Sequence, residues 1–144
     1  MIKDRIKEMI LESDKRQAVG ILVLCKDTDK VLLLKRNYEP HKGKWSVLSG
    51  GVDKGESKLA ALKREIMEEI KVDADDKIDI KYRYSEDMGD KIFHYYEGFT
   101  NNEFKCKLDD ENSDYGWFGV DELPSPLYPK TKDKIEELCQ KNKK

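Results

Sequence analysis

The sequence predicts an α+β or α/β fold in which a mixed β-sheet lies between helices. Apolar, β-branched runs over residues 17–25 and 31–35 flank the polar turn 27–30, which is the pattern of a β-hairpin. Residues 57–70 place leucines and isoleucines at helical spacing. Alternating apolar patterns then return over residues 78–108. This order of strands, helix and strands favours helices packed on a mixed sheet.

The length and composition indicate one folded domain over residues 1–144. Charged residues make up 40% of the chain, yet the net charge is only −2 and the apolar residues stand in blocks, which is not typical of disorder. The balanced charge gives no general footprint for nucleic acid or for an anionic membrane. No apolar stretch approaches about 18 residues, so we expect no membrane span.

The three cysteines, Cys25, Cys106 and Cys139, are odd in number and far apart in the sequence. They form no Cys-x-x-Cys pair, so we expect reduced thiols rather than disulfides or a structural zinc site. The first residues mix charged with apolar side chains, which is not the pattern of a signal peptide. We therefore expect a cytoplasmic protein. Its sequence leaves a monomer and a homodimer both open.

Ahead of the central helix, the sequence predicts one more helix, a loop and a short strand. Apolar residues at helical spacing predict an amphipathic helix over about residues 2–13. Residues 37–44 hold a proline and a glycine and are expected to form a loop. Residues 45–48 are predicted as a short strand that leads into the glycine-rich stretch 49–55. Ser57 is the predicted N-cap of the central helix.

The central helix is expected to end at about Ile70. At about 100° per residue, its apolar residues fall on one face: Leu59, Leu62, Ile66 and Ile70. The elements predicted after it are strands at 78–84, 91–100 and 104–108, a loop at 109–115, a short strand at 117–120 and a helix over about 131–141.

The central helix also carries three glutamates at positions i, i+3 and i+4: Glu65, Glu68 and Glu69. Carboxylates at this spacing destabilise a helix by roughly a few tenths of a kcal/mol per pair, and a bound cation reverses the sign of that effect. Carboxylate oxygens without a nearby His or Cys suit a hard ion such as Mg²⁺ or Mn²⁺. Taken alone, such a face in a chain with 30 acidic residues is more often solvated surface.

The segment ahead of the helix favours the interpretation of the three glutamates as a metal site. Gly50, Gly51 and Gly55 lie between a predicted strand and the helix start, which gives a tight loop with exposed backbone N–H groups. Such a loop can approach phosphates or lend a carbonyl oxygen to a metal. Glycine-rich turns are common without any ligand, so the glycines and the glutamates are informative only together.

The combined spacing is that of a known family motif. Gly50, five residues, Glu56, seven residues and then the run Arg64–Val72 resemble the Nudix box, G-x5-E-x7-R-E-U-x-E-E-x-G-U, in which U is a bulky aliphatic residue. Every defined position matches except one, because Lys71 stands where the family has Gly. The box therefore covers residues 50–72.

The resemblance implies a role for each matching residue. Glu65 and Glu69 resemble the family's principal metal-binding carboxylates, and Glu68 resembles a third ligand or part of the base. Glu111 is the candidate for a distant loop carboxylate that acts as a ligand or as the base. The carbonyl of Ser49 stands where the family often uses a Gly carbonyl as a ligand.

Other residues are expected to support the site or to meet the substrate. Glu56 resembles the family's loop-supporting glutamate, and Arg64 is expected to orient Glu68 or another carboxylate. The implied catalytic set is Glu56, Arg64, Glu65, Glu68, Glu69 and Glu111. The residues expected to contact substrate are Lys35, Arg36, Gly50 and Gly51. Four aromatic residues are candidates either for stacking on a base or for the core: Tyr38, Phe93, Tyr95 and Trp117.

Two departures from the motif bear on local geometry. Ser49 replaces the Gly that the family usually has before Gly50, so Ser49 must tolerate a backbone geometry where Gly is common. Lys71 replaces a Gly at the helix end and removes an easy left-handed C-cap. We expect the helix exit to be altered and the chemistry to be kept, because a cation is acceptable near a helix C-terminus.

The resemblance extends over about residues 18–128 and implies the Nudix fold and a Mg²⁺- or Mn²⁺-dependent hydrolase. Such an enzyme cleaves the diphosphate bond of a nucleoside diphosphate linked to another moiety, by attack of metal-activated water. ADP-ribose-like compounds, dinucleotides and nucleoside triphosphates all remain open as small-molecule substrates.

Three other functions are compatible with parts of this pattern. A nucleotide-binding or sensor module without turnover usually lacks box glutamates, and here all are present. The family's isomerase branch is expected to need a cysteine near the loop before the box, and residues 45–51 contain none. RNA 5′-end pyrophosphohydrolysis is the same reaction on a larger substrate and remains open.

Overall fold

The structure is a computed structural model that describes residues 15–143, so the helix predicted over 2–13 lies outside the described residues. Its strands are β1 (Arg16–Cys25), β2 (Lys30–Arg36), β3 (Trp45–Ser46), β4 (Leu48–Gly51), β5 (Asp79–Asp87), β6 (Lys91–Thr100) and β7 (Asn112–Phe118). Its helices are α2 (Lys58–Ile70), α3 (Ala74–Lys77) and α4 (Thr131–Asn142).

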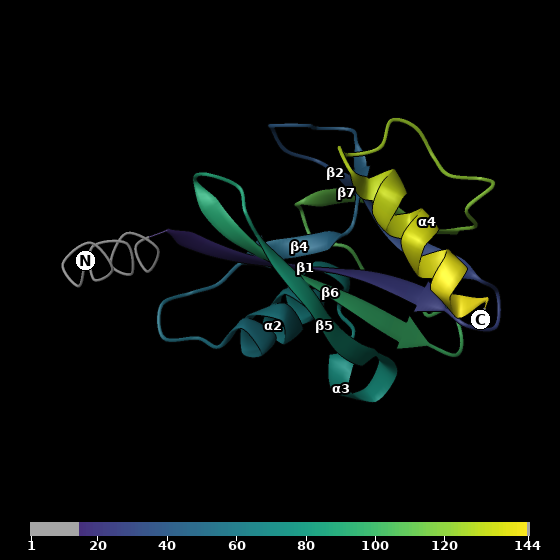
Figure 1. Cartoon of the computed structure of the whole chain (residues 1–144), viewed down its shortest axis with the longest axis horizontal. Helices are drawn as coiled ribbons and strands as arrows, with labels where there is room; N and C mark the ends of the chain where they lie inside the picture. The colour runs from purple at the N-terminus through teal and green to yellow at the C-terminus, as the bar shows by residue number, and fades with distance from the viewer. Residues whose placement is uncertain (1–14, 144) are drawn as a thin grey trace, which may run out of the picture.

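β1 runs through the middle of a seven-stranded sheet (Figure 1). Hydrogen-bonded neighbours follow the order β3-β2-β1-β6-β5, while β4 also pairs with β1 and β7 with β2. β1 and β6 are parallel, and the remaining pairs are antiparallel. The predicted mixed sheet is confirmed.

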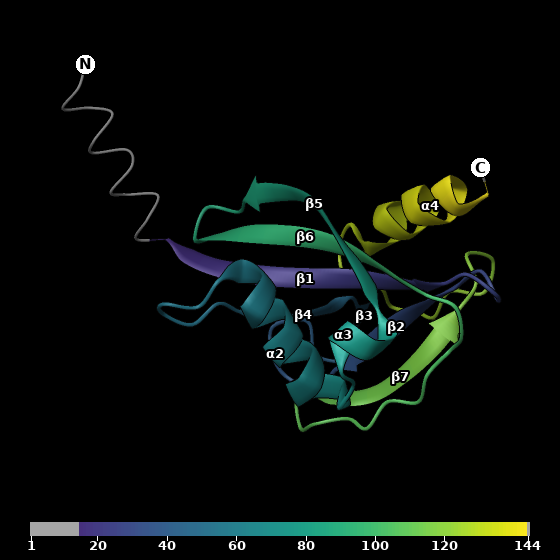
Figure 2. The ribbon, with the colours of Figure 1, turned by 90° about the horizontal axis from the view of Figure 1, so that it is seen from below.

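Side chains of β1 alternate between two apolar layers, because successive residues of a strand point to opposite faces. Val19, Ile21 and Val23 belong to the layer that α2 covers. Leu22 and Leu24 belong to the layer that α4 covers. Figure 2 shows α2 below the sheet and α4 above it. The continuous apolar run of β1 is thus explained by burial on both faces.

The hairpin predicted around residues 27–30 is confirmed. Cys25 of β1 opposes Lys30 of β2, and Asp29 in the turn has a φ of 58°. Asp tolerates this left-handed conformation better than most residues do, because its short polar side chain bonds locally. The Asp29 carboxylate also accepts a hydrogen bond of 3.1 Å from Asn142, which ties the turn to the end of α4.

The single strand predicted over 45–48 is wrong. The structure has two short strands, of which β3 pairs with β2 and β4 pairs with β1. The chain changes its pairing partner between Ser46 and Leu48, and a pattern of apolar residues does not reveal such a change. β6 has the predicted bounds, whereas β5 extends past Tyr84 to Asp87.

Helix α2 begins at the predicted N-cap, since the Ser57 hydroxyl accepts a hydrogen bond of 3.1 Å from the Ala60 N–H. Its apolar face buries Leu62, Ile66 and Ile70 as predicted. Leu59, however, is 42% exposed, so its assignment to that face is wrong. The buried arc of α2 also contains Ala61, Glu65 and Glu69, which turns the centre of the arc away from Leu59 in the first turn.

The C-terminal end of α2 keeps the geometry that Gly usually provides. Lys71 adopts the left-handed conformation, with φ 57° and ψ 43°, and its N–H donates to the Met67 carbonyl. The Lys71 ammonium donates to the Glu68 carbonyl at 2.7 Å. The expectation of an altered helix exit is therefore wrong, because this lysine takes the strained backbone conformation and caps a carbonyl with its own side chain.

The two remaining end carbonyls of α2 explain why residues 104–108 are not the strand that was predicted. Lys107 N–H donates to the Ile70 carbonyl at 3.0 Å, and Asp109 N–H donates to the Glu69 carbonyl at 3.2 Å. These N–H groups bond to the helix end instead of a neighbouring strand. β7 instead covers Asn112–Phe118, which overlaps both the predicted loop 109–115 and the predicted strand 117–120.

Helix α4 lies where a helix over 131–141 is predicted, and it buries Ile135, Leu138 and Cys139 against the sheet. Within residues 15–143, no helix has both the length and the hydropathy that a bilayer crossing requires.

We predict that Lys71→Gly increases the free energy of unfolding by up to about 1 kcal/mol, because Gly removes the cost of a left-handed backbone. Lys71→Ala keeps that cost and loses the exposed hydrogen bond to Glu68, so it should be neutral or slightly destabilising. Urea unfolding of both variants beside the wild type measures the difference. If Lys71→Gly destabilises as much as Lys71→Ala, the side-chain cap outweighs the backbone strain.

Candidate metal and substrate site

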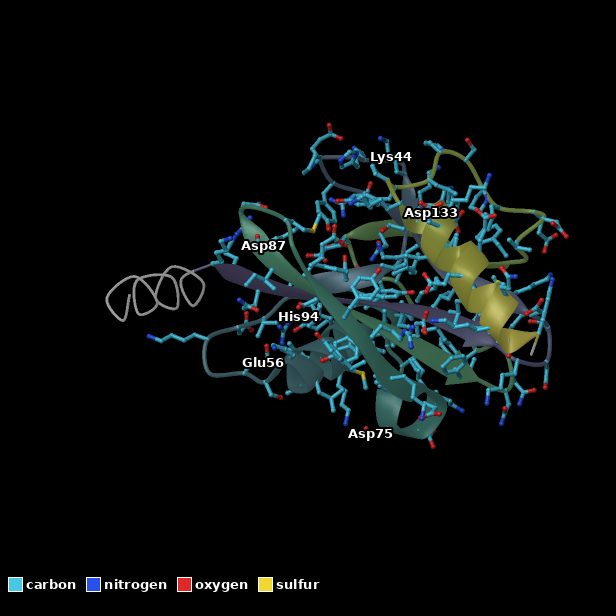
Figure 3. The ribbon with its side chains drawn as sticks, in the orientation of Figure 1. Lys44, Glu56, Asp75, Asp87, His94 and Asp133 are labelled. Carbon is cyan, nitrogen blue, oxygen red and sulfur yellow. The ribbon has the colours of Figure 1, made fainter. Side chains whose placement is uncertain are left out.

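The glycine-rich loop connects β4, which pairs with the central strand β1, to α2. β4 pairs along β1 as far as Gly51, and the next N–H, that of Val52, donates to the Gln17 carbonyl at 2.9 Å. The chain then turns through residues 53–57 into α2. Figure 3 shows Glu56 beside this entry to the helix.

Three carboxylates meet where α2 faces the loop before β7. Glu65, Glu69 and Glu111 each offer one oxygen, and these oxygens lie within 4.8 Å of one another. Glu65 and Glu69 are only 8% and 4% exposed, and Glu111 is exposed. The second Glu69 oxygen, Oε2, is buried and has no hydrogen-bond partner. A set of carboxylate oxygens with one oxygen unsatisfied fits a hard divalent cation such as Mg²⁺ or Mn²⁺.

Burial dominates the electrostatics of the cluster. The pKa of Glu69 is raised to about 9, chiefly by burial; a hydrogen bond from Asn112 opposes the rise, and the neighbouring carboxylates of Glu65 and Glu111 add to it. Burial also raises the pKa of Glu65, against the lowering effect of Arg64. The pKa of Glu111 is raised by burial and by Asp109. A positive charge placed between these carboxylates favours their ionised forms.

Glu68 lies outside this cluster of three. Its side chain is 55% exposed, and it accepts a hydrogen bond of 3.2 Å from Arg64. About 100° of rotation per residue places Glu68 on the solvent side of Glu65, whereas Glu69 lies on the buried side. Of the helix carboxylates proposed as ligands, the structure thus brings together Glu65 and Glu69.

Arg64 joins the loop to the helix. Its guanidinium donates to both oxygens of Glu56, at 2.8 and 3.0 Å, and to Glu65 at 2.8 Å. It also donates to the Gly51 carbonyl at 2.9 Å. Glu56 in turn accepts the Asp53 N–H at 3.0 Å, and these bonds lower the pKa of Glu56 to about 2. With so many protein acceptors, Arg64 serves the loop and the carboxylates rather than a substrate.

Gly50 is required by the position of Glu65. A Cβ atom at Gly50 would overlap the carboxylate end of Glu65, whereas a Cβ atom at Gly51 would meet nothing within 4 Å. Ser49, the departure from the family pattern, does not take a left-handed backbone conformation. The special geometry expected at Ser49 is therefore absent, because Ser49 lies in the regular ladder of β4, opposite Gly20.

A cavity of about 620 Å³ opens beside the carboxylates. Its wall includes the loop and the cluster through Ser49, Gly50, Gly51, Glu65 and Glu111. Another part of its wall comes from a region that the sequence did not single out: Tyr128, Pro129, Lys130, Thr131 and Lys134. These residues lie at and before the start of α4, far from the box in sequence, and no spacing signal connects the two.

Lys35 and Arg36, both predicted to contact substrate, differ in position. Arg36 lines the cavity and Lys35 does not. The Arg36 guanidinium donates twice to the Pro40 carbonyl, at 3.1 and 2.9 Å. Its central carbon lies 4.1 Å from the Tyr38 ring centre and 5.3 Å from that of Tyr128. Arg36 therefore holds the loop after β2 and two aromatic rings together at the cavity wall.

Of the four aromatic residues considered for stacking on a base, two line the cavity and two lie in the apolar layers. Tyr38 and Phe93 line the cavity. Tyr95 is buried in the layer under α4, and Trp117 packs against the layer under α2. The core alternative therefore holds for Tyr95 and Trp117.

Comparison with known proteins agrees with this geometry. A protein-family model described as NUDIX domain matches residues 14–139. The chain belongs to the Nudix family. Its mixed sheet between two helix layers has the fold that the resemblance implied.

Two curated relatives are named as hydrolases. Dihydroneopterin triphosphate diphosphatase of Haemophilus influenzae is 25% identical over 108 residues, which cover 74% of this chain and 67% of that protein. RNA pyrophosphohydrolase of Pelagibacter ubique is 47% identical over 57 residues, which cover 40% of this chain and only 35% of that protein.

A solved structure shares the fold over nearly its whole length. The MutT protein of Methanosarcina mazei Go1 is 23% identical to this Nudix domain and superposes with a TM-score of 0.68. The superposition covers 91% of this chain and 99% of that one.

We predict that Gly50→Ala destabilises the Nudix domain by about 1–3 kcal/mol, because the added methyl group must displace the buried Glu65 side chain. Gly51→Ala is the matched control and should change stability by less than about 0.5 kcal/mol. Chemical denaturation measures both. Equal effects of the two substitutions would contradict the close contact of Gly50 with Glu65.

We also predict that the stability of the metal-free protein falls as the pH rises from about 4.5 to about 9. In this window, folded Glu69 keeps a proton that the unfolded chain releases, so a higher pH favours the unfolded state. Glu69→Gln should remove much of this slope. Urea unfolding with a chelator, at several pH values across the window, measures both proteins, and identical slopes would contradict the raised pKa.

Proposed function

We propose that this Nudix domain is a Mg²⁺- or Mn²⁺-dependent hydrolase of diphosphate bonds in nucleotide-derived compounds. The observation that supports this most directly is the meeting of Glu65, Glu69 and Glu111 with one buried carboxylate oxygen of Glu69 unsatisfied. Without a cation, these positions bury like charges or keep a proton on Glu69, whereas a divalent cation compensates the carboxylates in their ionised forms.

The proposed ligands are the carboxylates of Glu65, Glu69 and Glu111, with the carbonyl of Ser49 and the exposed Glu68 as further candidates. When bound, a divalent cation offsets phosphate charge and acidifies water. Arg64 keeps Glu65 in place through the 2.8 Å bond to its Oε1 atom. Gly50 and Gly51 at the cavity wall allow a phosphate to approach the backbone closely.

The proton of the attacking water needs an acceptor. Glu111 lines the cavity and is exposed, so it is a candidate for this acceptor if it does not itself ligate the cation. Glu68 is the second candidate, because it is solvent-accessible and adjacent to Arg64. Buried Glu69 is the least accessible of these carboxylates.

The cavity wall supports a substrate that combines phosphates with a planar ring. Tyr38, Phe93 and Tyr128 provide aromatic surface. Arg36 and the lysines near the start of α4, Lys130 and Lys134, provide positive charge. Nucleoside triphosphates, dinucleotides, ADP-ribose-like compounds and pterin triphosphates all fit this description, and so does the 5′ end of an RNA. We further propose a cytoplasmic location, which the free thiols of Cys25, Cys106 and Cys139 favour.

We predict that the wild type cleaves at least one of these compounds with Mg²⁺ or Mn²⁺ and not with a chelator. Glu69→Gln should lower kcat at least about 100-fold, since losing about 3 kcal/mol of charge stabilisation corresponds to that factor. Glu103→Gln, an exposed glutamate away from the cavity, is the matched control and should keep full activity. Product identity from each compound defines the bond that is cleaved.

The same panel separates the alternatives. Tight nucleotide binding without product would indicate a binding or sensor module. Cleavage of 5′-triphosphate RNA in preference to every small molecule would indicate an RNA 5′-end pyrophosphohydrolase. If no diphosphate compound is cleaved, or if Glu69→Gln retains full activity, the hydrolase proposal is wrong.

A further inference from the structure

We propose that Asn112 is a positioning residue that fixes the orientation of Glu69 and, together with Asp109, couples Glu69 to Glu111. The proposal rests on the function proposed above, since it assigns Asn112 to the same carboxylates. Asn112 lies outside the box, within the stretch that resembles the family, but the resemblance assigned it no role.

Asn112 is the first residue of β7 and is only 7% exposed. Its Nδ2 atom donates to Glu69 Oε1 at 3.1 Å and lies 3.4 Å from Asp109 Oδ1. The side-chain amide has two N–H donors on one nitrogen, so it can satisfy both carboxylates at once. An aspartate of the same shape would place a third negative charge there. A neutral amide that donates hydrogen bonds is therefore suited to a position between Glu69 and Asp109.

The bond to Glu69 determines which carboxylate oxygen remains available. Oε1 is held by Asn112, and Oε2 is buried without a partner. A carboxylate that is free to rotate would exchange its two oxygens, whereas a single strong donor on one side prevents this exchange. Asn112 therefore leaves Oε2 as the oxygen available for a cation.

Asp109 extends the same arrangement to the loop carboxylate. Its Oδ1 atom accepts the Glu111 N–H at 3.1 Å, and its own N–H donates to the Glu69 carbonyl at 3.2 Å. The Glu111 and Asp110 carbonyls are held from the other side by the backbone and side chain of Asn37, at 2.9 and 3.1 Å. The segment that carries Glu111 is thus anchored both to α2 and to the loop after β2.

The effect expected from this arrangement is on cation affinity. Groups that orient metal ligands typically change affinity or activity by about 10- to 100-fold when removed. The alternative is that Asn112 only fills space at the start of β7. A space-filling role affects folding stability and leaves the affinity of a correctly folded variant unchanged.

We predict that Asn112→Ala raises the Kd for Mn²⁺ at least about tenfold. Binding is measured without substrate, by the loss of the free-Mn²⁺ electron paramagnetic resonance signal. Asn112→Leu, which keeps the approximate shape but has no donor, should show the same rise. Asn102→Ala, an exposed asparagine elsewhere, is the matched control and should keep the wild-type Kd. Circular dichroism establishes that each variant is folded.

A double-variant comparison tests whether Asn112 acts through Glu69. In a Glu69→Gln background, Asn112→Ala should change the Kd less than about twofold, because the carboxylate that it orients is gone. In steady-state assays, Asn112→Ala at saturating Mn²⁺ should lower kcat and leave the substrate KM nearly unchanged.

The outcomes separate the two proposals. If the wild type does not bind Mn²⁺, the proposed function fails. If the wild type binds and Glu69→Gln weakens binding, but both folded Asn112 variants keep the wild-type Kd, only the positioning role is overturned. Failure of both Asn112 variants to fold, with Asn102→Ala folded, also overturns it, because Asn112 would then be a core residue.

Discussion

Two carboxylates, Glu65 and Glu69, are buried side by side where α2 meets the sheet. The repulsion between them is the constraint on which the rest of the site depends. Like charges in a region of low dielectric destabilise the fold unless a cation, a proton or a hydrogen-bond donor compensates. Arg64 compensates Glu65, and Asn112 compensates one oxygen of Glu69. The other Glu69 oxygen, Oε2, is buried without a donor from the described residues.

The burial of Glu65 also accounts for the glycine at position 50 and for the path of the loop before α2. Gly50 has no side chain because the Glu65 carboxylate occupies the space where a Cβ atom would lie. Arg64 reaches Glu65 and the Gly51 carbonyl at the same time, so the guanidinium couples the position of a buried charge to the path of the backbone. Glu56 holds that guanidinium with both of its oxygens. The buried carboxylate of Glu65 is thus supported by the ion pairs that Arg64 forms with Glu65 and Glu56.

The parts of the structure that could be predicted are those with a local physical signal. The hairpin around residues 27–30 and the N-cap at Ser57 depend on neighbours only a few residues away, and Leu62 and Ile66 fall on one face through their helical spacing. The spacing within residues 50–72 likewise reflects contacts within one loop and one helix. Such contacts leave a pattern in the sequence because the chain itself determines the distances.

The parts that failed depend on distant partners. Residues 104–108 alternate like a strand, yet the N–H groups of Lys107 and of the following Asp109 bond to the end of α2, which no local pattern can reveal. The exposure of Leu59 and Glu68 follows from how α2 is rotated against the sheet. Asn112 and the cavity residues near Tyr128 meet the box only through the three-dimensional fold.

The docking of residues 107–109 onto the end of α2 has a consequence for motion. This stretch has no regular secondary structure, yet its amide groups complete the hydrogen bonding of the helix that bears the glutamates. The amide protons of Lys107 and Asp109 can exchange with solvent only when that helix end opens. The segment leading to Glu111 therefore belongs to the same cooperative unit as α2. If this segment detaches from the end of α2, Glu111 moves away from Glu65 and Glu69.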